Sequence, residues 1–397
     1  MGALSRRAFI RAAGAAAGGA VLAGCAPRAS RPGRAGGVLP IGDDIRPIPA
    51  GSGVERGATL RVYQWRDYLS GDVLDGFARR QAASDVSVEV ESFTTMAEAV
   101  QRLREPGGDF DVFFPTIDAL AGLVGEGLLR PLTHDLLPRH SNLWPFFLED
   151  EGPFYDVGQR YSVPYTVYST GIGWRRDLVR ASDAPDRLEN PYDAYWNPRY
   201  RGAVGIYDDH REAIAMSLLR RGESPNTTDA RLIDEAVDDL TAMARAVDVE
   251  VSAEGAYHEL QTGEYAFQQS WSGDVLSAKR FGTVAADDAG RVAFTWPRGG
   301  IVGCDLTAIC ARGRNPVLAH AFVDHLLDVG VAMENFRWNG YQPPVGDERP
   351  RGVPASLDAA ILHPRDLTVG RFLRPLGPEA DARWRVGWHR FLSSLAS

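Results

Sequence analysis

Cysteine, lysine and long apolar runs are all scarce in this sequence of 397 residues. Two of its three cysteines, Cys304 and Cys310, lie in an apolar stretch, where a strand would place both on one face but too far apart for a disulfide. We therefore expect two free thiols in the core. No metal-ligand spacing surrounds them, so neither a metal nor another cofactor is expected. Lysine occurs once, as Lys279, which leaves arginine to carry nearly all of the positive charge.

Beyond the N-terminal segment, the sequence contains no run of the roughly 20 apolar residues that a membrane-spanning helix needs. Its 44% hydrophobic and 24% charged residues are typical of a globular protein. The net charge of −9 argues against nucleic acid as a partner and favours a cationic one. Gly-x-Ser-x-Gly, His-Glu-x-x-His and phosphate-binding loops do not occur either, which leaves an enzymatic function with little support.

The first 25 residues have the features of an export signal. The pair Arg6-Arg7 precedes an apolar segment without acidic residues, as in twin-arginine signals, and Leu22-Ala23-Gly24-Cys25 resembles the lipobox of bacterial lipoproteins. We predict cleavage before Cys25, lipidation of its thiol, and anchoring at the outer face of the cytoplasmic membrane, in the periplasm or at the cell surface. Export by the general secretory route is an alternative to the twin-arginine route.

The organisation of the rest follows from composition and periodicity. Residues 26–57 are rich in Pro, Gly, Ala and Arg, which predicts a flexible tether. The residues from 58 onward exceed what one core normally supports, so two lobes are expected. Alternating strand-like and helix-like runs predict a parallel α/β sheet with ligands bound beyond the carboxyl ends of its strands. The expected strands are 58–63, 86–90, 110–114, 265–267 and 301–311, and the expected helices are 71–80, 96–104, 230–247 and 316–329.

Aromatic residues paired with acids follow two of these strands. Trp65 and Tyr68 flank Asp67 after the first strand, and Trp271 precedes Asp274 after 265–267. An ammonium group gains roughly 0.5–2 kcal/mol over such a ring, and a carboxylate beside it adds an ion pair. Both segments therefore suit a cationic ligand. A half-buried loop with an aromatic plug is the structural alternative for the first of them.

Acids at two further places have competing explanations. Asp209 and Glu212 have the spacing of a capping box before an apolar helical run; they would also offset the helix dipole beside a cationic ligand. Asp305 lies in an otherwise apolar strand and must have a partner, either a ligand or a backbone amide at a hinge. Carboxylate-assisted hydrolysis by Asp208, Asp209 and His210 is the weaker, enzymatic alternative.

Several short motifs occur in a fixed order along the chain. They are Trp-x-x-Tyr at 65–68, Phe-Asp-Val-x-x-Pro-Thr at 110–116, Tyr-Ser-Val-Pro-Tyr at 161–165, Asp-Asp-x-Arg-Glu at 208–212, Asn-Thr-Thr-Asp at 226–229, Trp-x-Gly-Asp at 271–274 and Gly-Tyr-x-x-Pro at 340–344. Each motif alone is weak. Their order and spacing, however, resemble those of the spermidine/putrescine-binding proteins of bacterial ABC importers over nearly all of residues 58–345.

The resemblance implies a two-lobed, type II-like periplasmic-binding-protein fold with a ligand cleft between lobes joined by a hinge. Lobe 1 would comprise 58–164 and 304–347, and lobe 2 would comprise 165–303 and 348–397. It implies a monomeric, non-enzymatic extracytoplasmic protein that binds a polyamine and delivers it to a membrane permease. Binding of another small organic cation or of an amino-acid derivative is the alternative.

The resemblance also implies ligand-binding residues, position by position. They form an aromatic box lined by carboxylates, with three departures from the family. One is that the C-terminal Gln that lines some family sites has no clear match near Phe372 and Leu373. Gly303 stands where relatives place a large aromatic side chain, which would open one wall, and Asp118 stands where they carry Tyr or Ser. The implied ligand-binding residues are Trp65, Asp67, Tyr68, Thr116, Asp118, Asp209, Glu212, Trp271, Asp274, Asp305 and Tyr341.

Overall fold

The computed structural model describes residues 39, 48–49, 51–149, 154–252, 258–277, 290–346, 350 and 353–395, all within one compact unit. The predicted export signal with its Cys25, and most of the predicted tether, lie outside these residues.

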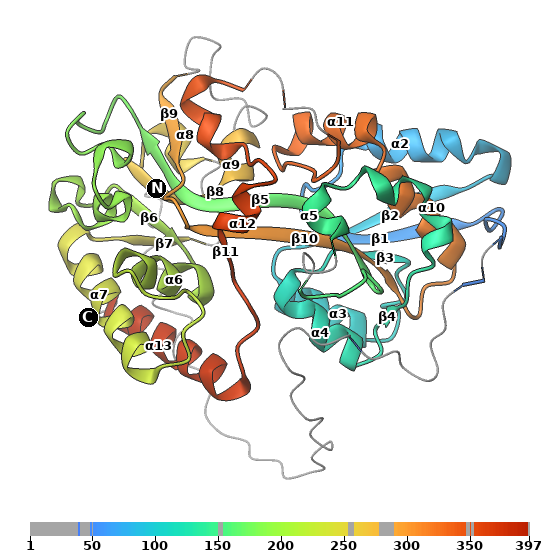
Figure 1. Cartoon of the computed structure of the whole chain (residues 1–397), viewed down its shortest axis with the longest axis horizontal. Helices are drawn as coiled ribbons and strands as arrows, with labels where there is room; N and C mark the ends of the chain where they lie inside the picture. Colours follow the sequence, from blue (N-terminus) through green and yellow to red (C-terminus); the bar gives the residue numbers. More distant parts are fainter. Residues whose placement is uncertain are drawn as a thin grey trace, which may run out of the picture. The chain divides into compact units, whose positions relative to one another are not determined.

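Within the described residues, eleven strands form one sheet in the order β2-β1-β3-β10-β5-β8-β6-β7, with β4 and β11 beside β10 and β9 beside β5 (Figure 1). The strands are β1 (Thr59–Trp65), β2 (Ser87–Phe93), β3 (Val112–Phe113), β4 (Leu129–Arg130), β5 (Ser162–Arg175), β6 (Val204–Tyr207), β7 (Glu250–Ser252), β8 (Phe267–Trp271), β9 (Val292–Thr295), β10 (Ile301–Cys310) and β11 (Arg371–Phe372).

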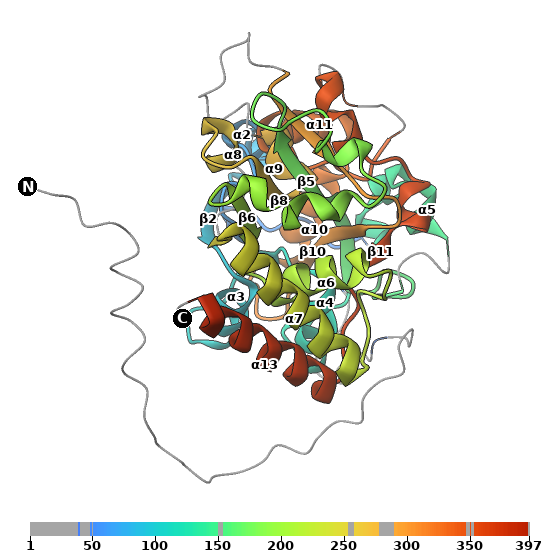
Figure 2. The same ribbon diagram turned by 90° about the vertical axis from the view of Figure 1, so that its left-hand side faces the viewer.

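Helices connect these strands and pack against them and one another; Figure 2 shows α7 and α13 side by side. The three helices predicted over 71–80, 96–104 and 230–247 are confirmed to the residue. Each begins after a side chain that accepts a hydrogen bond from the first turn: Ser70, Thr95 and Asp229. The helices are α2 (Gly71–Arg80), α3 (Met96–Arg104), α4 (Ile117–Gly125), α5 (Pro145–Leu148), α6 (His210–Arg220), α7 (Ala230–Val247), α8 (Glu259–Thr262), α9 (Ser272–Ser277), α10 (Pro316–Leu326), α11 (Val329–Asn339), α12 (Asp366–Val369) and α13 (Pro378–Leu395).

The prediction of a parallel sheet is correct at the two ends of the sheet and wrong in its middle. β1 is parallel to β2 and β3, and β6 is parallel to β7 and β8. Between these groups β5 and β10 are antiparallel to each other and run from one group to the other, in green and orange in Figure 1. A buried antiparallel strand has the same unbroken apolar run as a parallel one, so the sequence pattern did not distinguish them. Cys304 and Cys310 on β10 are buried free thiols, as predicted.

The apolar side chains form two large cores that divide within these two long strands. Val167 on β5 and Val302 on β10 belong to the first core, whereas Ile172 and Ile301 belong to the second. Between them, residues 168–171 of β5 belong to neither core. The fold is therefore two-lobed, and the two long strands cross from one lobe to the other.

The helix predicted over 316–329 is two helices. α10 ends at Leu326, and α11 begins after Asp328, whose carboxylate accepts hydrogen bonds from the amides of Gly330 and Val331. Of the helices in the described ranges, none by itself has the length and apolar character to cross a membrane. α10 and α11 pass that test only as a pair, which is bent by 76°.

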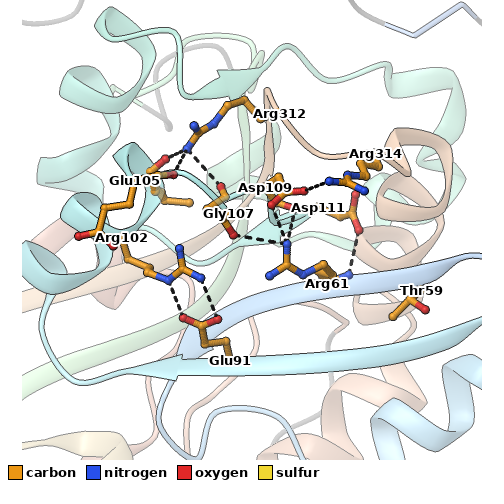
Figure 3. Close-up of polar contacts among 12 residues, drawn as sticks. Thr59, Arg61, Glu91, Arg102, Glu105, Gly107, Asp109, Asp111, Arg312 and Arg314 are labelled. Carbon is orange, nitrogen blue, oxygen red and sulfur yellow. Dashed lines mark hydrogen bonds and ion pairs between the residues drawn. The ribbon is translucent and has the colours of Figure 1, made fainter.

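A polar cluster joins the amino ends of β1 and β3 to the loop after β10 (Figure 3). The backbone N–H of Arg61 donates to Asp111 at 2.8 Å, and the Arg61 guanidinium pairs with Asp109 at 2.9 Å. Arg314 contacts the same Asp109 at 2.8 Å. These contacts fix one end of the first group of strands. The carboxyl ends of β1 and β3 lie at the opposite edge, where the residues of the candidate site follow them.

Candidate ligand-binding site

Asp305 is a carboxylate on β10 that is only 8% exposed, and its backbone forms a β-bridge with Thr116 at the start of α4. Its Oδ2 accepts a 2.5 Å hydrogen bond from the hydroxyl of Tyr68, which also lies 2.6 Å from Thr166 Oγ1. Among the described residues, Oδ1 accepts no hydrogen bond. Burial raises the pKa of Asp305 to about 7; the Tyr68 bond lowers it and the charge of Asp118 raises it.

Glu212 in the first turn of α6 is a second buried carboxylate, 5% exposed. Its Oε1 accepts hydrogen bonds from Trp271 Nε1 at 3.0 Å and Thr170 Oγ1 at 3.2 Å, whereas Oε2 is buried and has no hydrogen-bond partner among the described residues. Burial raises its pKa to about 7, and the charge of Asp209 adds to the rise. The capping-box explanation is therefore half correct: Asp209 caps α6, but Glu212 points to β5 and β8 instead.

Asp274, in the first turn of α9, is held by two tyrosines. Tyr207 donates to its Oδ2 and Tyr341 to its Oδ1, each at 2.5 Å. The Tyr207 hydroxyl also accepts the backbone N–H of Trp271 at 2.8 Å, and the two rings stack with centroids 4.2 Å apart. The sequence reasoning missed Tyr207, although it lies at the end of β6 directly before the predicted acids. Tyr341 packs against the first core, so its bond to Asp274 connects that core with α9.

A continuous series of rings connects Glu212 with Asp305; we call it the aromatic path. It consists of Trp271, Tyr168, Tyr341 and Tyr68. Successive centroids are 6.1, 6.3 and 5.7 Å apart, and each pair meets edge to face. Trp271 donates to Glu212 at one end, and Tyr68 donates to Asp305 at the other. Three of these four rings were predicted as site residues.

Tyr168 is the fourth, and it corrects the prediction that Gly303 opens a wall of the site. The two residues are paired across β5 and β10. A Cβ at position 303 would lie 2.2 Å from Cζ and 2.5 Å from the hydroxyl oxygen of Tyr168, so the tyrosine ring fills the space beside the glycine. Only strand register could have identified this residue, because 135 positions of sequence separate the pair.

The other predicted residues lie around this group. In the described part of the chain, Thr116 Oγ1 and Trp65 Nε1 are buried without hydrogen-bond partners, and the Trp65 ring packs 4.6 Å from Phe93. Asp118 is exposed on α4, but its charge raises the pKa of Asp305. Asp67 is exposed and has a left-handed φ of 59°. Hydrogen bonds and ring contacts thus join Tyr68, Asp305, Tyr341, Asp274, Trp271 and Glu212 to one group, and Asp209 accepts a hydrogen bond from the Glu212 backbone N–H beside it.

The buried carboxylates of the site favour a cationic ligand. No ion pair within the described ranges involves Glu212 or Asp305. The nearest arginine in sequence, Arg211, donates to the backbone oxygen of Arg374 and to Asn226 instead. Because a buried carboxylate without a partner is costly, these groups either hold a proton or bind a positive ligand. In the described part of the chain, no group of His, Cys, Asp or Glu is arranged to hold a metal.

Comparison with protein families decides the wider identity. Residues 77–355, more than half of the chain, match the model of the bacterial extracellular solute-binding proteins. The chain belongs to that family. Members of the extracellular solute-binding family are binding proteins, in keeping with a site built from carboxylates and rings.

Curated relatives of this solute-binding protein include two whose names state their ligands. The spermidine/putrescine-binding periplasmic protein of Escherichia coli is 27% identical over 312 residues, 78% of this chain and 84% of the relative. The putrescine/cadaverine-binding protein of Pseudomonas aeruginosa is 28% identical over 319 residues, 80% and 88% of the two chains.

Solved structures agree on the fold. The substrate-binding protein of a spermidine/putrescine ABC transporter from Streptococcus pneumoniae has a TM-score of 0.68 at 19% identity, covering 85% of this chain and 99% of the other. A lipoprotein of Treponema pallidum has a TM-score of 0.71 at 17% identity, covering 84% and 99%. This solute-binding protein therefore has the two-lobed periplasmic-binding-protein fold that the sequence predicted.

Proposed function

We propose that this solute-binding protein captures a polyamine outside the cytoplasm and delivers it to the permease of an ABC importer. The observation that carries the proposal is the pair of buried carboxylates, Asp305 and Glu212, joined by the aromatic path. A polyamine has ammonium groups separated by methylenes, so it matches acids at two ends with rings between them. The names of the curated relatives, which bind spermidine, putrescine or cadaverine, support the same ligand class.

Ligand capture would work by closure of the two lobes. We assign residues 58–164 and 304–347 to lobe 1 and 165–303 and 348–397 to lobe 2, with the hinge in β5 and β10. The division of the cores supports this assignment, while Leu367 and Phe372 pack in the first core, so the C-terminal segment contacts both lobes. The bond from Tyr341 to Asp274 joins the lobes across the site. Closure excludes water and strengthens each ion pair, and the closed form is the one a permease would bind.

The cellular setting follows from the same proposal. The relatives named periplasmic support export, and the twin-arginine pair and the lipobox support a lipid anchor at Cys25 on the outer face of the cytoplasmic membrane. The protein would act as a monomer without catalytic activity. Its acids bind a cation rather than activate a nucleophile.

Isothermal titration with putrescine, cadaverine, spermidine and spermine tests the proposal. We expect micromolar or tighter binding of at least one of them to the wild-type protein after bound ligand is removed. Asp305→Asn and Glu212→Gln should each weaken that binding by about tenfold or more, because each removes a buried charge that pairs with an ammonium group. Circular dichroism should show that both variants are folded.

Asp75→Asn is the matched control, because Asp75 is an exposed acid on α2 outside the site. It should bind like the wild type. No heat with any of the four polyamines, from a folded and ligand-free sample, would refute the polyamine assignment. The screen would then move to other organic cations and amino-acid derivatives.

A further inference from the structure

The candidate site includes an aromatic side chain from a strand on which no site residue was predicted. Tyr168 lies on β5, between the two cores, and is paired with Gly303 on β10. Its ring fills the space that a side chain at position 303 would need, with the Gly303 Cβ position 2.2 Å from Tyr168 Cζ. Gly303 has no positive φ, so the backbone itself does not require glycine there. What excludes a larger residue at 303 is the ring of Tyr168.

The position of this ring makes it the link in the middle of the aromatic path. Its centroid lies 6.1 Å from Trp271, which donates to Glu212, and 6.3 Å from Tyr341, which packs on Tyr68. Without Tyr168 the path would break into Trp271 beside Glu212 and the pair of Tyr341 and Tyr68 beside Asp305. A ligand that extends between the two acids would have its methylenes beside the part of the aromatic path that Tyr168 forms.

The surroundings of the Tyr168 hydroxyl also support a role for this residue in the site. Burial raises the pKa of Tyr168, and the charges of Asp305, Glu212 and Asp118 raise it further. The phenol therefore stays neutral beside a set of acids, and its ring is half-buried. A neutral ring in the middle and acids at the ends is the distribution that a linear diamine needs.

We propose that Tyr168 is a specificity-determining residue: it provides the central wall of the polyamine site from β5, in place of a side chain at 303, and limits the length of ligand that fits. This inference rests on the proposed function. Because the ring fills volume between the two acids, it favours a short diamine that lies extended along it. Its removal opens space into which the extra methylenes of a longer polyamine can fold.

A double-mutant cycle tests the inference by titration with putrescine and spermidine. Tyr168→Ala should weaken putrescine by about fivefold, since a ring contact of this kind is worth about 1 kcal/mol and tenfold is about 1.4 kcal/mol. Spermidine should lose less, so that preference shifts toward the longer ligand. Gly303→Ala should also weaken putrescine, because its methyl group displaces the Tyr168 ring. In the Tyr168→Ala background, Gly303→Ala should have no further effect.

Gly122→Ala on α4 is the matched control, because a Cβ there meets nothing within 4 Å, and it should bind like the wild type. Thermal melts confirm that each variant is folded. Two outcomes overturn the inference while the proposed function stands: additive effects of the two substitutions, or an unchanged ratio of putrescine to spermidine affinity in Tyr168→Ala. Absence of polyamine binding to the wild type overturns the proposed function, and this inference with it.

Discussion

Lowering the pH from 8 to 6 should weaken polyamine binding strongly, because the two carboxylates that receive the ammonium groups are neutral at the lower pH. Burial raises the pKa of both Glu212 and Asp305 to about 7. A bound ammonium stabilises the ionised form of each acid. The ligand therefore binds the ionised protein, and binding at or below pH 7 releases protons.

The magnitude follows from these two pKa values. A carboxyl with a pKa of about 7 is ionised in about one molecule in ten at pH 6 and in about nine in ten at pH 8. Each acid thus contributes about a tenfold change in Kd, and the two together about a hundredfold, equivalent to about 2.7 kcal/mol. The ammonium groups of the ligand, with a pKa near 10 like that of lysine, stay charged over this range.

The assay is isothermal titration with putrescine at pH 6, 7 and 8, in buffers with different ionisation enthalpies. The dependence of the heat on the buffer counts the protons released, and about two should be released at pH 6. Glu212→Gln should release about one and retain about a tenfold pH effect from Asp305. Asp75→Asn should behave like the wild type. An equal Kd at pH 6 and 8 with no proton release would show that the acids are already ionised in the free protein, and the reasoning would be refuted.

Two further predictions concern single hydrogen bonds. Tyr341→Phe removes the 2.5 Å bond to Asp274, the proposed link between the lobes, but keeps the ring in the aromatic path. Small-angle scattering should therefore find a larger share of open protein without ligand, and titration should give a weaker Kd. An unchanged scattering profile would contradict a role in closure. The carboxylate of Asp209 caps α6 by accepting hydrogen bonds from the amides of Arg211 and Glu212. Asp209→Ala removes this cap and should lower the free energy of unfolding, measured by urea titration, by about 1 kcal/mol. A loss of binding without a loss of stability would instead place Asp209 at the ligand.

Helices were predictable from the sequence where local contacts decide them. α2, α3 and α7 begin after Ser70, Thr95 and Asp229, and these caps and the apolar periodicity lie within a few residues of each other. β8 was less well predicted, because its buried part contains polar as well as apolar residues and so lacks an apolar run. It covers Phe267–Trp271 and not 265–267. The break between α10 and α11 was missed because both helices are apolar enough to read as one.

Of the predicted site residues, Tyr68, Glu212, Trp271, Asp274, Asp305 and Tyr341 are joined in the structure by hydrogen bonds and ring contacts. The partner of each group was not predictable. A capping box was one of two explanations for Glu212, yet its side chain accepts bonds from Thr170 and Trp271, which come from β5 and β8. Tyr207 lies directly before the predicted acids, but its role depends on Asp274, 67 positions away.

The sequence by itself thus determined the family, the two-lobed class of fold, the helices with clear caps and the acidic, aromatic character of the site. Tertiary structure alone decided the antiparallel crossing of β5 and β10, and with it the pairing of Tyr168 with Gly303. The physical reason is that periodicity and capping act over a few residues, whereas strand register is fixed by the packing of both faces of the sheet across long separations. That a glycine in one strand leaves room for a tyrosine in the next can be recognised only once that register is known.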